Sequence, residues 1–377
     1  MRPDAPSSLS PDKTDPVQPD FQTYWPTDRG YDWQVGLLRF LLSSDAYRDI
    51  ATFLGGEEAL KLSKPDMHGL HHRAIGFLHR SLDARLRRRF VQAIAEYAET
   101  CIGPGSARPV PPEAEAIGRD IDRNGYAVLP AIPADWADEI RGYAADTTMH
   151  NWAGDVEGPL ESLRADHNLA ICRSAALLTL PHIQAIATDP VIGAAVERHL
   201  GAPPILLGTA LWCSFAGKQA RDAQFFHYDL DDYRFCKLFI YLTDVDEEGG
   251  PHVYLPRTHD PDYIAACRPE PGPERDTFDH WYFQDLRKQD AAAIRHLNQE
   301  PVTLTGAKGT RLLVNTEGIH KGLPPQKQDR WLLQLLFGVS HFTQWGGSFD
   351  APVLDAAAPA EAYLLGGLFP TRAVGAG

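Results

Sequence analysis

The sequence predicts an α+β protein that is mainly β with flanking helices and has a jelly-roll core. Beyond residue 200, short apolar or alternating runs recur between turns of Gly, Pro and Asp. Strands at this density are typical of β-sandwiches and jelly rolls. In residues 31–101, apolar residues instead recur at three- and four-residue steps, which is typical of helices. We therefore expect a helical region followed by a β domain.

The first part of the chain divides into three predicted segments. Residues 1–20 are rich in Pro, Asp and Ser, so we expect a disordered arm. Residues 21–102 are the helical region, with at least two helices. Its clearest apolar face is formed by Ile75, Leu78, Leu82, Leu86, Phe90, Ile94 and Tyr97. Prolines then interrupt the pattern, so residues 103–114 are predicted to be a linker, with a domain boundary near residue 110.

Two polar clusters lie in the helical region. His68, His71, His72 and His79 have no carboxylate or cysteine at a familiar metal-ligand spacing. We therefore interpret them as a solvated start of a helix rather than as a metal site. The basic run at residues 85–89 is likewise interpreted as a solvated helix face. No role follows from the sequence for this region.

Residues 115–345 form the predicted β domain, and residues 346–377 a C-terminal extension. The domain begins with a strand at 126–129, a helix after Pro133 and a helix around 191–200. The later predicted strands are 205–215, 235–243, 253–255, 302–304, 310–314 and 330–339.

A charged, aromatic-rich and partly helical insert, residues 260–300, interrupts these strands. Insertions of this length inside a compact domain are often lids, so we interpret it as a candidate substrate cover. Its aromatic residues Trp281, Tyr282 and Phe283 either pack over a substrate or anchor the lid. The sequence leaves both alternatives open.

Composition argues against several classes of partner. The 377-residue chain carries a formal net charge of −14, so it has no basic surplus to neutralise nucleic acid or an anionic membrane. No apolar run approaches the ~18 residues of a membrane span. The five cysteines are widely spaced, without a C-x-x-C pair, and favour a cytoplasmic protein. A small-molecule substrate is the expected partner, and the oligomeric state cannot be read.

His227 and Asp229 are candidate metal ligands. They lie two residues apart, and in an extended strand such side chains project from the same face. The strongest third candidate is His320, which follows a strand-like run and precedes a Gly-Leu-Pro-Pro turn. Two imidazoles and one carboxylate leave three positions open on an octahedral ion, as in non-haem iron(II) oxygenases. Zinc hydrolases can use the same ligands, so ligand type alone does not choose the metal.

Arg330 favours iron over zinc. It lies ten residues after His320, at the start of the strand at 330–339. Its guanidinium offers a planar fork for one carboxylate, and its charge favours a dianionic keto acid that chelates iron at its other end. A zinc hydrolase has no need of such a residue and would require a general base. No H-E-x-x-H or similar motif supplies that base.

Several runs together resemble one known family. They are FHYD at 226–229, LTDVDEEGGP at 242–251, LPRTH at 255–259 and, upstream, NGYAVLP at 124–130. With His320 and Arg330, they resemble the phytanoyl-CoA dioxygenase family over roughly residues 115–345.

The resemblance implies a double-stranded β-helix core of the cupin type, and iron(II), 2-oxoglutarate and O₂ as cofactor and cosubstrates. His227, Asp229 and His320 are then the catalytic metal ligands, and Arg330 binds the cosubstrate. It also implies that Gln224 and His252 line the cosubstrate pocket. From the residues alone, Gln224 could equally satisfy a backbone group, and His252 could be only a turn residue.

The implied reaction is hydroxylation of a C–H bond in a small organic molecule, with release of succinate and carbon dioxide. Related halogenases replace the ligand carboxylate by Gly or Ala, so Asp229 favours hydroxylation over halogenation. Desaturation, epimerisation and ring closure at the same centre stay open. So does a non-catalytic, cupin-like protein that senses a ligand.

Overall fold

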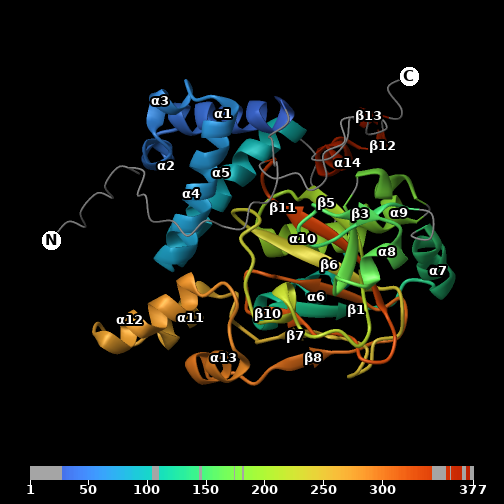
Figure 1. Cartoon of the computed structure of the whole chain (residues 1–377). Helices are drawn as coiled ribbons and strands as arrows, with labels where there is room; N and C mark the ends of the chain where they lie inside the picture. Colours follow the sequence, from blue (N-terminus) through green and yellow to red (C-terminus); the bar gives the residue numbers. More distant parts are fainter. Residues whose placement is uncertain are drawn as a thin grey trace.

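The computed structural model shows N-terminal helices beside a β core, with a helical insert at the edge of the core (Figure 1). The predicted disordered arm, residues 1–20, lies outside the residues that it describes. Those residues are 28–103, 110–143, 147–173, 175–180, 182–341, 354–356, 358–366 and 371–373.

The described part of the N-terminal region is helical, as the three- and four-residue spacing predicts. Its helices are α1 (Asp28–Ser43), α2 (Arg48–Phe53), α3 (Gly56–Ala59), α4 (Lys64–Ser81) and α5 (Ala84–Ile102). Side chains cap the two longest helices. Ser63 accepts a hydrogen bond from the amide of Asp66 at the start of α4. Asp83 does the same for Arg85 and Leu86 at the start of α5.

The main sheet of the β domain is antiparallel throughout. Five of its strands lie within strands that the sequence predicts, whereas β4 and the two-residue strands β2 and β3 were not predicted. Two residues are too few for alternation to be seen in β2 and β3. In spatial order the strands are β1 (Tyr126–Leu129), β9 (Arg311–Val314), β6 (Phe235–Tyr241), β11 (Arg330–Gly338), β5 (Ile205–Ser214), β4 (Leu169–Arg173), β2 (Met149–His150) and β3 (Glu157–Gly158).

A second, smaller antiparallel sheet faces the main one. Its strands in spatial order are β10 (His320–Gly322), β7 (His252–Tyr254) and β8 (Val302–Leu304). Alternate side chains of the main sheet, such as Phe239 and Tyr241, pack with Tyr254 of this sheet in one buried cluster. The predicted fold class, an antiparallel jelly-roll core with flanking helices, is therefore confirmed.

Helices cover the other face of the main sheet. They are α6 (Pro112–Asn124), α7 (Ala134–Gly142), α8 (Leu160–Arg164), the 3-10 helix η2 (Ala175–Thr179), α9 (Ile183–Ala187) and α10 (Pro190–Leu200). Helix α6 begins inside the predicted linker. Pro112 occupies its first turn, where the missing N–H costs nothing, so a proline interpreted as a helix breaker in fact starts a helix.

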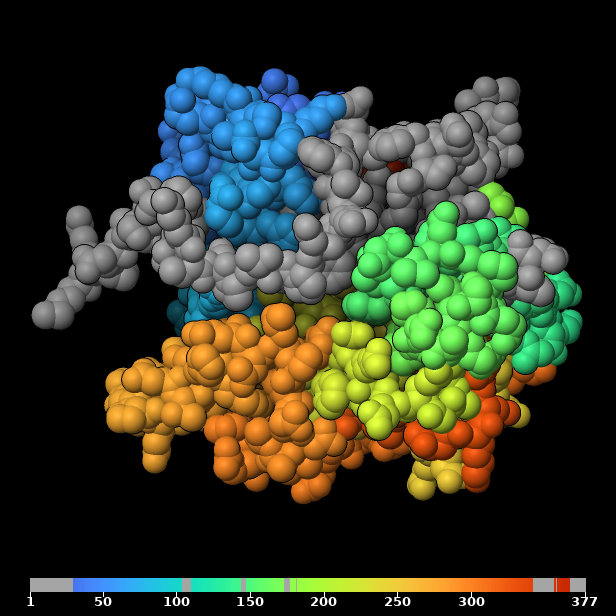
Figure 2. Space-filling model, viewed as in Figure 1, coloured from blue at the N-terminus to red at the C-terminus, as the bar shows by residue number. Residues whose placement is uncertain are grey.

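The insert is helical, with α11 (Pro261–Cys267), α12 (Pro273–Asp279), the π-helix η4 (His280–Gln284) and α13 (Asp290–Leu297). In the space-filling view it lies beside the yellow-green segment that precedes β6 (Figure 2). Trp281 and Tyr282 are buried in the cluster beneath it. The ring of Tyr282 stacks on that of His79 from α4, with centroids 5.8 Å apart. The anchoring alternative is thus supported for these two aromatics.

Polar side chains dock the N-terminal helices onto the β domain. The Nδ1 atom of buried His71 lies 2.6 Å from the hydroxyl of Tyr233. Arg87 pairs with Glu317 at 3.0 Å, and both side chains are less than a tenth exposed (8% and 5%). The expectation of solvated faces is therefore wrong for His71, His79 and Arg87. Helical spacing alone did not reveal that these residues share the docking face.

Burial of His71 predicts acid sensitivity. Burial lowers the pKa of its imidazole to about 3, against about 6.5 in an unfolded chain. Below pH 6.5 the unfolded chain therefore binds a proton that the folded protein does not, and stability falls as the pH falls towards 3. Between pH 7 and 5, His71→Gln is expected to lose about 2 kcal/mol less stability than the wild type.

Urea unfolding at both pH values measures this difference. His280→Gln, which removes an exposed histidine, is the control and is expected to follow the wild type. A His71→Gln profile that also follows the wild type would contradict the prediction.

The remaining described elements lie near the C-terminus. The described C-terminal elements are β12 (Leu354–Ala356), α14 (Pro359–Leu365) and β13 (Thr371–Ala373).

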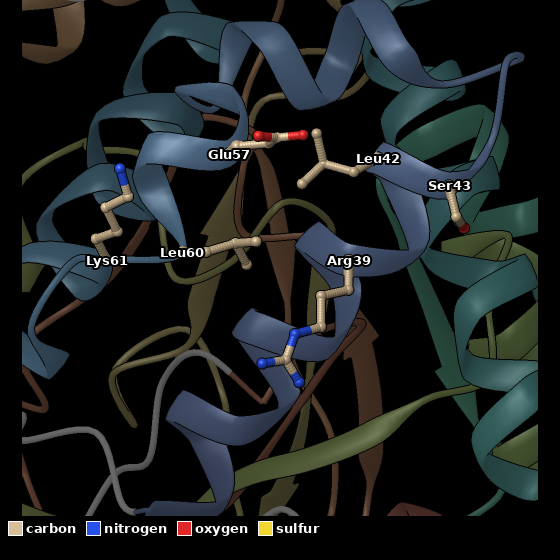
Figure 3. A pocket seen from close by; sticks show the side chains of 6 residues that line it. All are labelled: Arg39, Leu42, Ser43, Glu57, Leu60 and Lys61. Carbon is tan, nitrogen blue, oxygen red and sulfur yellow. The ribbon is translucent and has the colours of Figure 1, made fainter.

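An open hollow between α1 and α3 contains none of the predicted site residues (Figure 3). Its lining residues are Arg39, Leu42, Ser43, Glu57, Leu60 and Lys61. Among the described helices, none combines the length and the apolar character needed to cross a membrane.

Candidate metal centre

The backbone brings the three candidate ligands together at one end of the β core. His227 and His320 form an antiparallel bridge, in which each amide donates to the other's carbonyl oxygen at 3.0 and 2.9 Å. The amide of Asp229 donates to the carbonyl of Thr316 at 2.8 Å. One possible ligand atom from each of the three side chains lies within 4.8 Å of the others. The set could hold one metal ion.

Hydrogen bonds fix which ring nitrogen each histidine turns to the centre. Nδ1 of His227 lies 2.8 Å from the carbonyl oxygen of Phe225, and Nδ1 of His320 lies 2.8 Å from that of Gly318. A carbonyl oxygen only accepts, so each Nδ1 carries the proton and each Nε2 keeps a lone pair. The two Nε2 atoms lie 3.6 and 3.5 Å from the carboxylate of Asp229. Histidines that bind metals are commonly oriented in this way.

Charge and burial leave the three groups in the protonation states that a metal requires. Burial lowers the pKa of His227 to about 3 and also lowers the pKa of His320, so both rings are neutral near pH 7. Burial raises the pKa of Asp229, but the charge and the hydrogen bond of Lys237 act in the opposite direction, and this pKa lies below its usual value. Neutral imidazoles and an ionised carboxylate are the ligand forms of a divalent ion.

Lys237 is a contact of the site that the sequence analysis missed. Its Nζ atom donates to Asp229 Oδ2 at 2.6 Å and lies 2.8 Å from Asp231 Oδ2. The side chain is buried on β6, on the same face as Phe239 and Tyr241. A single lysine inside an otherwise apolar strand was the signal that could have found it. It holds one oxygen of this candidate ligand, Oδ2, in place.

Loss of Lys237 is expected to destabilise the metal-free protein. Lys237→Met leaves two neighbouring carboxylates without their cation, at a cost of about 3 kcal/mol. A divalent ion at the centre would restore the compensating charge, so Mn(II) is expected to raise the melting temperature of the variant more than that of the wild type. Thermal unfolding with and without Mn(II) measures both effects. Lys308→Met, which removes a lysine paired with Asp138, is the control. Equal gains from Mn(II) would contradict the prediction.

Arg330 lies at the start of β11 with its side chain buried. One terminal nitrogen donates to the carbonyl of Gly250, and the other donates to the hydroxyl of Ser214 at 2.9 Å. Its Nε atom is buried and has no partner among the described residues. The protein thus fixes the plane of the guanidinium and leaves its Nε–H without a partner among the described residues.

Gln224 and His252 also present buried polar atoms without protein partners. The amide oxygen of Gln224 accepts from the backbone N–H of Arg221 and from Asn168, both at 2.9 Å. The alternative that Gln224 satisfies a backbone group therefore accounts for its amide oxygen. Its amide nitrogen has no partner in the described chain. His252 stacks on His320, with centroids 5.3 Å apart, and its Nε2 atom is unpartnered in the same sense.

These unpartnered atoms test whether a keto acid fits. Buried polar groups without partners are costly, so a ligand is the simplest reason for their presence. Burial lowers the pKa of His252, and the charge of Arg330 lowers it further. The ring of His252 lies against that of His320. The buried N–H donors of Arg330 and Gln224 suit a carboxylate-bearing cosubstrate, so the residues fit the group that the sequence predicted.

The family model described as phytanoyl-CoA dioxygenase matches residues 121–327, more than half of the chain. The chain belongs to the phytanoyl-CoA dioxygenase family. Its members depend on iron(II) and 2-oxoglutarate, and the protein is an oxygenase-type enzyme of this kind. The match contains His227, Asp229 and His320 but ends before Arg330. No curated protein matches the chain.

Several solved structures of 2-oxoglutarate-dependent enzymes are similar to this phytanoyl-CoA dioxygenase family member. One is SnoN, an epimerase from nogalamycin biosynthesis, with 18% identity, 60% of this chain and 82% of that chain covered, and a TM-score of 0.42. Another is HygX from Streptomyces hygroscopicus with nickel, 2-oxoglutarate and hygromycin B bound, with 15% identity, coverages of 64% and 91%, and a TM-score of 0.39. Similarities this distant bear on neither substrate nor reaction.

Proposed function

We propose that the protein is a dioxygenase that hydroxylates a C–H bond of a small organic molecule. One oxygen atom of O₂ enters the product, and the other enters succinate as 2-oxoglutarate loses carbon dioxide. The observation that carries the proposal is the centre itself. Two histidines, each fixed by a carbonyl at Nδ1, direct Nε2 towards one ionised carboxylate. That ligand set leaves positions free for a chelating cosubstrate.

Each residue of the centre has a proposed task. His227, Asp229 and His320 hold iron(II), and Arg330 pairs with the far carboxylate of 2-oxoglutarate. Gln224 and His252 contact the cosubstrate through their side-chain nitrogens. The burial of these nitrogens without a protein partner among the described residues supports this role. The bound iron and keto acid supply the oxidising chemistry, whereas the protein positions the substrate and keeps water out. The insert at residues 260–300 covers the centre.

Hydroxylation is preferred over halogenation because Asp229 retains the carboxylate that halogenases lack. Desaturation, epimerisation and ring closure require the same centre and differ in how the substrate is held. A location in the cytoplasm is part of the proposal and follows from the cysteine pattern of the sequence.

The test is succinate formation from 2-oxoglutarate by the purified protein loaded with iron(II) under air. Slow turnover without substrate is expected, because many such centres consume 2-oxoglutarate uncoupled from substrate. Once a substrate is known, hydroxylation under isotopically labelled O₂ should place one labelled oxygen atom in the product. Desaturation and ring closure would place none there. Absence of turnover, together with absence of iron and 2-oxoglutarate binding, would favour the cupin-like binding protein.

A further inference from the structure

The insert returns to the metal centre through one strand-like contact. The amide of Lys288 donates to the carbonyl of Phe226 at 2.7 Å, and these two residues form an antiparallel bridge. Arg287 is therefore opposite His227, and side chains at opposite positions of an antiparallel pair share one face. His227 is itself paired with His320 on its other side. Arg287, His227 and His320 thus form a row that faces the centre.

The neighbours of Arg287 support this assignment of faces. The Nζ atom of Lys288 lies 4.7 Å from the centroid of the Tyr228 ring and is buried on the face away from the centre. Arg287, by contrast, acts on the centre through its charge. Besides burial and closer groups, that charge contributes to the lowered pKa values of both candidate histidine ligands. Burial lowers the pKa of the Arg287 guanidinium, and the carboxylates of Asp229 and Asp222 act in the opposite direction.

Arg287 differs from the other cations of the site because most of its N–H donors have no partner among the described residues. Lys237 is paired with two carboxylates, and Arg330 donates to two protein oxygens. Arg287 makes one hydrogen bond, to the carbonyl of its neighbour Leu286 at 3.2 Å, and no ion pair within the described chain. The residue is exposed, so a molecule entering the centre can reach it. A guanidinium has five N–H donors in a planar fork that matches a carboxylate.

We propose that Arg287 binds a carboxylate of the substrate, so that the enzyme acts on monocarboxylic acids. This inference rests on the function proposed above. One unpaired cation matches one negative charge, whereas a phosphate dianion would favour a second. Lys237 is already paired, and Lys288 faces away. Arg330 donates to Gly250 and Ser214, whereas Arg287 adjoins the bridge of Lys288 with Phe226, so cosubstrate and substrate carboxylates have separate anchors.

Binding without turnover tests the proposal. The probes are aliphatic and aromatic monocarboxylates, each paired with its primary amide. Ligand-observed NMR measures their dissociation constants on protein loaded with nickel(II) and saturated with 2-oxoglutarate. The wild type is expected to prefer acids over their amides by at least about tenfold. Arg287→Gln should lose this preference, and Arg287→Lys should keep part of it. Arg295→Gln, which removes another exposed arginine of the insert, should keep it fully.

Each other outcome overturns the proposal. No acid preference in the wild type, or a preference that survives in Arg287→Gln, removes the anchor. Weaker 2-oxoglutarate binding in Arg287→Gln would instead assign Arg287 to the cosubstrate. Metal and 2-oxoglutarate binding by the wild type are measured first. Their absence overturns both the proposed function and this inference, whereas their presence without an acid preference overturns only the role of Arg287.

Discussion

Replacement of His227 by alanine is expected to abolish succinate formation and to weaken iron(II) binding more than about a hundredfold. Loss of groups that merely orient a ligand already costs tenfold to about a hundredfold in metal affinity or activity, and this variant loses the ligand itself. His227 also bridges His320 through the backbone. Because alanine preserves that backbone pairing, the variant isolates the imidazole from the strand contact that positions it.

Anaerobic iron(II) titration and succinate formation measure the two effects. His259→Ala is the matched control, because it removes a buried histidine outside the candidate metal centre, whose Nε2 atom lies 3.0 Å from the carbonyl oxygen of Asp122. It is expected to bind iron like the wild type. A His227→Ala protein that retains wild-type iron affinity would show that the ion binds elsewhere.

Features set by local pattern could be predicted from the sequence. Alternation gave the main strands, and the two-residue spacing of His227 and Asp229 put both side chains on one face. His320 was predicted from its position after a strand-like run, and Arg330 from its position at the start of a strand. The family resemblance supported both predictions. The structure brings His320 into contact with His227, and it places the guanidinium of Arg330 at the carbonyl of Gly250, two residues before His252.

Features set by long-range packing could not be predicted. Arg87 and Glu317 are 230 residues apart, and neither one's sequence neighbourhood indicates the other. His71 was assigned to solvent because a helix pattern does not say which domain will cover its face. The contact between Lys237 and Asp229 depends on a turn that folds the ligand segment back onto the following strand. Arg287 required a strand-like pairing that no periodicity in the insert announces.

Replacement of Arg330 by glutamine is expected to raise the KM for 2-oxoglutarate about a hundredfold with iron(II) affinity unchanged. Loss of one partner of a buried, hydrogen-bonded charge pair costs about 2–5 kcal/mol, and a hundredfold corresponds to about 2.7 kcal/mol. Arg330→Lys keeps the charge but loses the planar fork, so an intermediate KM is expected.

A merely structural role for Arg330 would also impair the enzyme, because its guanidinium holds the carbonyl of Gly250 and the hydroxyl of Ser214. Pyruvate separates the two cases, since it keeps the chelating keto acid and lacks the far carboxylate. The wild type should bind 2-oxoglutarate much more tightly than pyruvate, and Arg330→Gln should bind both alike. Arg164→Gln, which releases the neighbouring Asp329, should retain the wild-type preference. An undiminished preference in Arg330→Gln would assign the far carboxylate to another residue.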